Sequence, residues 1–351
     1  EFSACLVGSE MCIRDSGGPG PWQSRVERLF ITAEFGAFSL GSFPSTMGGW
    51  MQTVALGWLV ASLGGSALSL GLLTFATMGP LLVAPFGGAL VDRLDRRRLL
   101  FCVTAVQMGA ALVLTALAFA GRLSLPLILL LAFVGGAPNA LGWPAWSAFI
   151  ADLVPPRSLR QAVAVNSARF NLTRVVGPAL AGLLLAQAGP QWCLAVAWLG
   201  TAIFCCTLAF LRPRHMRPHG RPEPVLRALA STARYVARDR SIITLLVAVG
   251  AVGLLVLPYA SFLPRFAKDV LNQGPEALGF LLTAGGCGAV AGAALSGSRL
   301  VAARPRPAAL VLHLLTCASA LGLALAPTLH VAAGFAAVSY THLTLPTILR
   351  V

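Results

Sequence analysis

The 351-residue sequence is 57% hydrophobic and only 11% charged, and its mean hydropathy is +0.79. A soluble globular domain carries about 25% charged residues, so this composition excludes that class and predicts a membrane protein. The formal net charge of +14 does not indicate a nucleic-acid partner, because 20 of the 26 Lys and Arg residues lie in connecting segments on one side of the predicted membrane. Only 3 lie on the opposite side, and this asymmetry predicts a cytoplasmic N-terminus.

Nine apolar stretches are long enough to cross a bilayer, which takes roughly 20 residues. They cover residues 36–63, 68–90, 99–120, 125–150, 162–188, 192–211, 242–263, 278–295 and 308–326. A tenth stretch begins at Val331 and ends too soon to cross. Because hydrocarbon offers the backbone no water, each span must be a helix that satisfies its own hydrogen bonds. We therefore expect an all-α, multi-pass protein of the inner (plasma) membrane, with the lipid bilayer around it.

The two ends of the chain do not fit this pattern. Residues 5–16 and 338–347 resemble translated sequencing-adapter read-through, and we interpret residues 1–16 and 338–351 as segments foreign to the protein. The alternative is a genuine polar terminus at each end. The foreign-segment interpretation implies that the chain is a fragment with about nine complete spans and the start of a tenth.

A short internal repeat suggests how the spans are organised. Residues 70–74, Leu-Gly-Leu-Leu-Thr, open the second span, and residues 278–283, Leu-Gly-Phe-Leu-Leu-Thr, open the eighth. Their glycines, Gly71 and Gly279, are 208 positions apart. Six spans precede a basic segment and the others follow it. The pattern predicts two related six-helix halves, residues 17–211 and an incomplete 241–337, joined by a cytoplasmic linker at 212–240.

A charged loop follows the second predicted span. Its order resembles the loop Gly-x-x-x-Asp-Arg-x-Gly-Arg-Arg of major facilitator transporters, which joins their second and third helices. The matching residues are Gly88, Asp92, Arg93, Arg96 and Arg97. Asp95 replaces the second glycine of the pattern. The resemblance implies a loop that gates the conformational change, whereas the alternative is a loop whose arginines merely anchor two helices.

Other segments resemble the exporter branch that includes enterobactin-type siderophore exporters and macrolide-efflux proteins. They are residues 50–60, 166–182 and 235–239. Within the fifth span, Gly177, Pro178 and Gly182 are similar to the antiporter motif Gly-Pro-x-x-Gly-Gly, with Ala181 in place of one glycine. Small residues also serve ordinary helix packing, which is the alternative interpretation. Where this branch often has Pro-Ala-Arg, the chain has Pro144-Ala145-Trp146.

Arg174 is the most informative charge within a predicted span, since it lies near the middle of residues 162–188. An arginine at that depth costs at least ~3 kcal/mol unless it faces a partner or a watery cavity. Helical spacing places it on one polar stripe with Ser167, Asn171 and Pro178. We expect this stripe to line a substrate cavity; the alternative is a structural arginine paired with an acid or a helix C-terminus in the spans that we expect to be absent from this chain. Arg169 is expected to reach the membrane interface. Further cavity candidates are Gln52, Asn139 and Trp143.

The acids limit the mechanism of coupling. No Asp or Glu lies in the middle of a predicted span. The titratable residues nearest to such a position are Glu34 and Asp92, at the cytoplasmic ends of spans, and His313, in the ninth span. Carriers coupled to protons usually need a titrating group within the membrane. Proton antiport is therefore implied by the family resemblance and not by a visible residue.

The sequence carries no sign of catalysis. No cysteine pair has metal-ligand spacing, so we expect no metal, and no cofactor motif is present. A constellation for intramembrane catalysis is absent too, which argues against an enzyme. The resemblance implies a secondary transporter that exports a small organic molecule, siderophore-like or drug-like, by alternating access. A non-transporting membrane sensor or scaffold is the alternative.

We predict that this chain alone does not transport. A two-half carrier encloses its site between its halves, and we expect Gly285, Gly286, Gly288 and Gly292 to lack packing partners here. Reconstituted in liposomes, the chain should show no substrate flux, whereas the complete parent protein should. Saturable export by the 351-residue chain would contradict this prediction.

Overall fold

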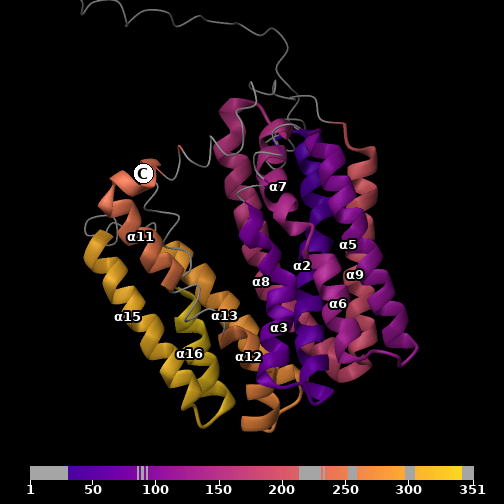
Figure 1. The fold of residues 1–351 in the computed structure, drawn as a ribbon, viewed down its shortest axis with the longest axis vertical. Coiled ribbons are helices and arrows are strands. Elements are labelled where there is room, and N and C mark those ends of the chain that lie inside the picture. The colour runs from indigo at the N-terminus through magenta and orange to yellow at the C-terminus, as the bar shows by residue number, and fades with distance from the viewer. Residues whose placement is uncertain are drawn as a thin grey trace, which may run out of the picture.

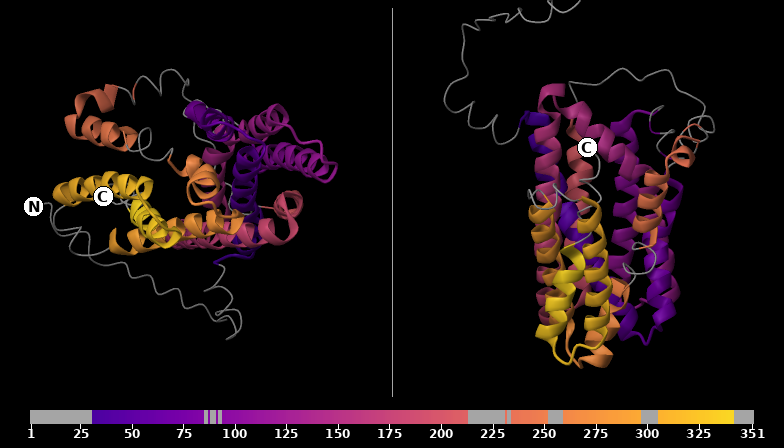
Figure 2. Two further views of the ribbon diagram at one scale, coloured as in Figure 1. Left: turned by 90° about the horizontal axis from the view of Figure 1, so that it is seen from below. Right: turned by 90° about the vertical axis from the view of Figure 1, so that its left-hand side faces the viewer.

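The computed structural model describes residues 31–84, 87, 91, 94–212, 231, 234–251, 259–296 and 305–341. The regular structure of these residues is entirely helical, in agreement with the predicted all-α class. The helices form two neighbouring groups, coloured indigo to rose and orange to yellow in Figures 1 and 2.

The first group contains the helices that precede residue 212. They are α2 (Ala33–Ser62), α3 (Ala67–Met78) with η1 (Gly79–Val83), α5 (Arg96–Phe119), α6 (Leu125–Gly136), α7 (Asn139–Leu153), η2 (Pro156–Ser158), α8 (Leu159–Ala188) and α9 (Pro190–Phe210). Within this group α2 packs against α8 and α9, and α5 packs against α6, α7 and α9.

The second group contains the helices that follow residue 239. They are α11 (Arg240–Ala251), α12 (Tyr259–Arg265), the π-helical η4 (Phe266–Val270), α13 (Pro275–Ser296), α15 (Pro305–Ala324) and α16 (Leu329–Thr341). Here α16 packs against α13 and α15. The proposed linker at 212–240 lies mostly outside the described residues, so the domain boundaries remain predictions.

Side chains of the connecting segments fix where several helices begin. The Thr32 hydroxyl accepts a hydrogen bond from the Phe35 amide at 3.0 Å and begins α2. Ser66 accepts from the Ser69 amide at 3.3 Å, and Asp95 accepts from the Arg98 amide at 2.9 Å. Each side chain satisfies an amide that has no partner within its own helix, which is the usual role of Ser, Thr and Asp before a first turn.

The predicted spans correspond to these helices, but fewer of the helices are both long and apolar than predicted, and one predicted span is interrupted. Within the described residues, three helical segments are long and apolar enough to cross a membrane: Arg96–Phe119, Leu125–Leu153 and Pro190–Phe210. The helices α2 and α8 are longer, at 30 residues each. Glycine and serine residues lower the hydropathy of α2, and asparagine and arginine residues lower that of α8. The span predicted at 242–263 is represented by α11 and α12, and residues 252–258 between them are not described.

Close approach of backbones holds α2 against α9. A Cβ atom added at Gly48 of α2 would lie 2.7 Å from the Cα atom of Ala197 in α9. The neighbouring Gly49 faces open space, with nothing within 4 Å of its Cβ position. Lipid tails are as apolar as side chains, so helices in a membrane gain stability from this dense contact and not from burial alone.

The two groups meet mainly where α13 crosses α8. A Cβ atom at Gly279 would lie 2.7 Å from the Cα atom of Gly182, and one at Gly286 would lie 2.9 Å from the Arg174 carbonyl oxygen. Gly285 and Gly288 are likewise covered, by Tyr340 and by the Ala337 backbone of α16. The expectation that Gly286 and Gly288 lack packing partners is wrong, because the backbones of α8 and α16 approach them. Gly285 is covered only through Tyr340 of the segment that we interpret as foreign, and Gly292 is buried.

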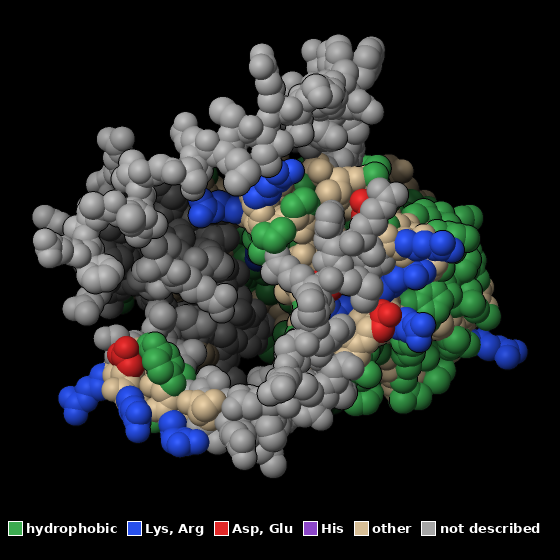
Figure 3. All heavy atoms as spheres, turned by 90° about the horizontal axis from the view of Figure 1, so that it is seen from above, with side chains coloured by type: hydrophobic (Ala, Val, Ile, Leu, Met, Phe, Trp, Pro, Cys, Tyr) green, Lys and Arg blue, Asp and Glu red, His purple; other side chains and the backbone are tan. Residues whose placement is uncertain are grey.

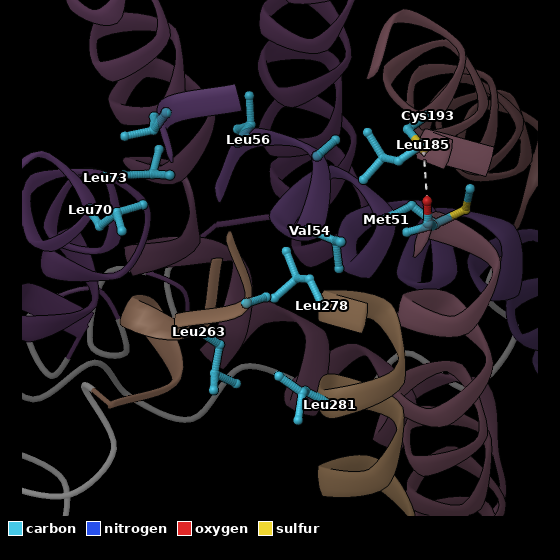
Figure 4. Close-up of a cluster of buried hydrophobic side chains, with 14 of the residues drawn as sticks. Met51, Val54, Leu56, Leu70, Leu73, Leu185, Cys193, Leu263, Leu278 and Leu281 are labelled. Carbon is cyan, nitrogen blue, oxygen red and sulfur yellow. Dashed lines mark hydrogen bonds between the residues drawn. The ribbon is translucent and has the colours of Figure 1, made fainter. Parts of the chain in front are cut away.

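An apolar cluster continues this contact between the groups. Leu278 points towards Val54 of α2, and Leu263 and Leu281 lie beside it (Figure 4). Leu70 belongs to the same cluster and, like Leu278, is fully buried. The two leucines that open the predicted repeat therefore occupy one common core.

Substitution of adjacent glycines tests the backbone contact. We expect Gly48→Ala to lower the free energy of unfolding by about 1–3 kcal/mol, because the methyl group meets the Ala197 backbone. Gly49→Ala is the matched control and should be neutral or stabilising by up to about 1 kcal/mol. Thermal unfolding in detergent measures both, and equal melting temperatures would contradict the prediction.

Candidate functional site

The charged loop before α5 is only partly described. Gly88, Asp92 and Arg93 lie outside the described residues. Arg96 is described, and its Nη1 atom donates to both Asp152 oxygens at 3.0 Å. The side chains of Arg96 and Asp152 are 16% and 6% exposed, so this ion pair joins α5 to the last turn of α7 within the protein. Asp152 carries no signal in the sequence, because its partner lies 56 residues away.

Arg97 connects α5 to a third helix. Its Nε atom donates to the Leu208 carbonyl at 2.9 Å, and its Nη2 atom donates to the Ala209 carbonyl. These carbonyls belong to the last turn of α9, where a cation is favoured by the helix dipole. Lys and Arg side chains gather around this end of the bundle (Figure 3). The two arginines therefore hold the ends of α5, α7 and α9 together.

The antiporter-like residues Gly177, Pro178 and Gly182 are buried in α8. A Cβ atom at Gly177 would lie 2.7 Å from the Trp50 Cβ atom of α2. One at Gly182 would lie 2.9 Å from the Gly279 Cα atom of α13. The motif thus lets α8 approach one helix of each group. Small-residue packing, the alternative interpretation, accounts for both glycines.

Arg169 does not reach the membrane interface, and that expectation is wrong. Its side chain is buried, with Nη1 donating to Ser42 Oγ at 2.5 Å and Nη2 donating to Asn166 Oδ1 at 2.8 Å. Its guanidinium also lies 5.3 Å from the centre of the Trp146 ring. Polar side chains of α2 and α8 replace water around the cation, so it is retained inside the first group.

Arg174 is half-buried and has a different environment. Its guanidinium lies 5.8 Å from the centre of the Trp50 ring and 4.6 Å from that of Tyr340. Tyr340 belongs to the segment that we interpret as foreign to the protein, so we rest nothing on its contact. Trp50 packs edge-on against Phe170 with ring centres 6.0 Å apart.

The other predicted cavity residues are only partly brought together. Trp143 is 51% exposed and lies 6.4 Å from Phe170, measured between ring centres. Gln52 is half-buried on α2. Asn139 accepts a hydrogen bond from Gln107 at 2.9 Å, and Asn171 donates to the carbonyl of Ser167 in its own helix at 3.0 Å.

Three aromatic side chains thus lie in a row, of which only Trp143 was expected from the sequence to line the cavity. The row consists of Trp143 on α7, Phe170 on α8 and Trp50 on α2, and Arg174 stands at its end. Trp50 and Phe170 could not be assigned to the cavity from the sequence, because aromatic residues are common in apolar spans. The contact between these rings depends on how three helices pack. Among the described residues, no three His, Cys, Asp or Glu side chains lie close enough to hold a metal ion.

Solved structures define the class of this fold. A bacterial homologue of the human lysosomal transporter Spinster, in an inward-facing state, matches with a TM-score of 0.66 and 18% identity over 93% of this chain and 75% of its own. A bacterial homologue of the iron transporter ferroportin, also inward-facing, matches with a TM-score of 0.64 and 16% identity over 89% of this chain and 81% of its own. The fold is that of the major facilitator transporters.

Sequence comparison identifies the family. Residues 30–341 match the model of the transmembrane secretion effector family. The chain therefore belongs to this family of the major facilitator superfamily, whose members are integral proteins of the cell membrane.

Several relatives are curated as transporters. The staphyloferrin A transporter of Staphylococcus aureus is 26% identical over 70% of this chain and 62% of its own length. The multidrug efflux pump Tap of Mycolicibacterium fortuitum is 29% identical over 70% of this chain and 62% of its own length. Macrolide efflux protein A of Streptococcus pyogenes is 26% identical over 59% of this chain and 50% of its own. The chain spans less than two thirds of these relatives.

The buried ion pair between α5 and α7 gives a testable prediction. We expect Asp152→Ala or Arg96→Ala to cost about 3 kcal/mol, because each leaves a buried charge without its partner. The double variant should cost less than the sum of the single variants. Melting temperatures in detergent measure the effect.

The control is a second arginine in the same turn. Arg98 pairs with Asp95 at 3.7 Å, but their side chains are 86% and 38% exposed. Arg98→Ala should therefore cost less than about 1 kcal/mol. A loss as large as that of Arg96→Ala would show that the general charge of this end, and not the buried pair, stabilises the fold.

Proposed function

We propose that the parent protein exports a small organic molecule across the cytoplasmic membrane by alternating access. The observation that carries this proposal is the pattern of contacts between the two groups of helices. Lys268 Nζ donates to the Ala61 carbonyl at 3.1 Å, and the Thr74 and Ser261 hydroxyls are hydrogen-bonded at 2.7 Å. Ala61 lies in the last turn of α2, and Gly182 and Gly279 lie near the end of α8 and the beginning of α13, where they contact each other.

The opposite end is held together within the first group. There Arg96 and Arg97 join α5 to α7 and α9, while α11 and α8 diverge in Figure 1. With a cytoplasmic N-terminus, which the distribution of basic residues supports, the contacts at the end of α2 correspond to a carrier closed on the outer side. The contact of α13 with α8 continues to Arg174 and Val175, near the middle of α8. Two halves in contact from the middle of the membrane towards one side suit a rocking mechanism.

The names of the relatives support the direction and the class of substrate. Two of them are curated as efflux proteins for drugs or macrolides, and one as a transporter of staphyloferrin A. Export of a siderophore-like or drug-like solute is therefore the activity that we assign to the whole protein.

Proton antiport is the coupling that the family resemblance implies. Of the Asp, Glu and His residues, only His313 lies inside a predicted span. Glu34, Asp152 and Glu276 are found in the first or last turns of their helices. A proton carried within the membrane by this chain would therefore be carried by His313.

An export assay tests the proposed function. The complete parent protein is produced in a bacterial host that lacks its own efflux pumps, and growth inhibition by a macrolide and siderophore secretion are measured. We expect reduced macrolide sensitivity or increased secretion of a siderophore. No change in either would contradict export of these two classes.

We propose further that the loop containing Asp92 is a latch. Asp92 would accept hydrogen bonds from a neighbouring helix N-terminus and from arginines in one conformation, and release them in the other. In the complete parent, Asp92→Asn should leave insertion and expression normal and remove most transport. Asp269→Asn, an exposed carboxylate paired with Arg265 at 2.7 Å, is the matched control and should transport normally. Wild-type turnover by the Asp92 variant would rule out the latch.

A further inference from the structure

The aromatic row forms a partly open surface across three helices. Trp143 is 51% exposed, and Phe170 and Trp50 are half-buried, so none of the rings is sealed in a core. Phe170 stands between the two tryptophans, at 6.4 Å and 6.0 Å. Arg174 follows Phe170 by one helical turn and covers the face of Trp50. One guanidinium and three rings therefore share one side of α8.

The charge of Arg174 is not balanced by an acid within the described part of the chain. There Arg174 faces the Trp50 ring, whereas Tyr340, in the segment that we interpret as foreign, adds a ring contact and a hydrogen bond. Ion pairs are instead found at Arg96, Arg98 and Arg265, among others. An unpaired arginine at this depth costs at least ~3 kcal/mol unless a partner or water is present.

The other arginine of α8, Arg169, differs from Arg174 because the protein itself supplies acceptors for its charge. Arg169 is more deeply buried, but Ser42, Thr46 and Asn166 all accept its hydrogen bonds. Its cation is therefore supported by the first group itself. Arg174 has the Trp50 ring and the Tyr340 side chain as neighbours instead, and the Tyr340 hydroxyl takes one hydrogen bond. A guanidinium carries five N–H donors, so most of them remain suited to a ligand.

We infer that the solute bound at this surface is an organic anion with an aromatic or flat apolar body. This inference rests on the proposed function and adds the class of substrate. A guanidinium binds carboxylate or phosphate through two parallel hydrogen bonds, and the rings pack against the body of the solute. A cationic solute of the same shape meets the like charge of Arg174 without a carboxylate to offset it.

Binding of three matched probes tests the charge preference. They are 1-naphthoate, its neutral amide and 1-naphthylmethylammonium, which share one ring system. Equilibrium dialysis of the purified 351-residue chain in neutral detergent, corrected for empty micelles, measures their binding. We expect 1-naphthoate to bind about tenfold more tightly than the other two.

Three variants assign the preference to Arg174. Arg174→Gln should abolish the preference and leave binding of the amide unchanged, which also shows that the variant is folded. Arg174→Lys keeps the charge and should keep the preference. Arg122→Gln, in the exposed connection between α5 and α6, lowers the net charge equally and should behave as the wild type.

Several results would overturn the inference. They are equal binding of the three probes, tighter binding of the cation, no binding of any probe, or a preference that survives in Arg174→Gln. Export of a cationic or neutral solute by the complete parent, unaffected by Arg174→Gln, would also overturn it while leaving the exporter function intact. Conversely, anion binding by the chain without export by the parent would contradict the proposed function alone.

Discussion

The close approach of α8 to helices on both of its sides is the contact on which the rest of the structure depends. Gly177 lets α8 meet Trp50 of α2, and Gly182 lets it meet Gly279 of α13. Helices in a membrane gain little from hydrophobic burial against each other, so dense contact between small residues supplies the stability. This contact also fixes where Arg174 lies, because its own carbonyl faces Gly286.

Two arginines on the same helix have different roles because of helical geometry. Arg169 and Arg174 are five residues apart, which is a rotation of about 140° between their directions. Arg169 therefore points into the polar side of α2, where Ser42 accepts its hydrogen bond. Arg174 points along the face that carries Phe170 and approaches Trp50. The first supports the fold, and we assign the second to the solute.

The bonds within a group differ from those between the groups. Charged groups at the ends of α5, α7 and α9 join helices of the first group, through Arg96 with Asp152 and Arg97 with Leu208. Between the groups the contacts are small residues, apolar side chains such as Leu278 with Val54, and hydrogen bonds such as Thr74 with Ser261. The ion pairs described above each lie within one group. Breaking a buried ion pair costs more than separating neutral surfaces, so the first group is suited to move as one body in the cycle that we propose.

The sequence by itself determined the all-α membrane class, the order of the spans and the family, because hydropathy and short motifs are local properties of the chain. It also indicated Arg174, since a charge within an apolar run is visible without coordinates. Only the tertiary structure decided that Asp152 pairs with Arg96, that Arg169 is buried against Ser42, and that Gly286 is covered by α8. The distance between two helices depends on how all their side chains pack, and neither the period nor the composition of one span contains that information.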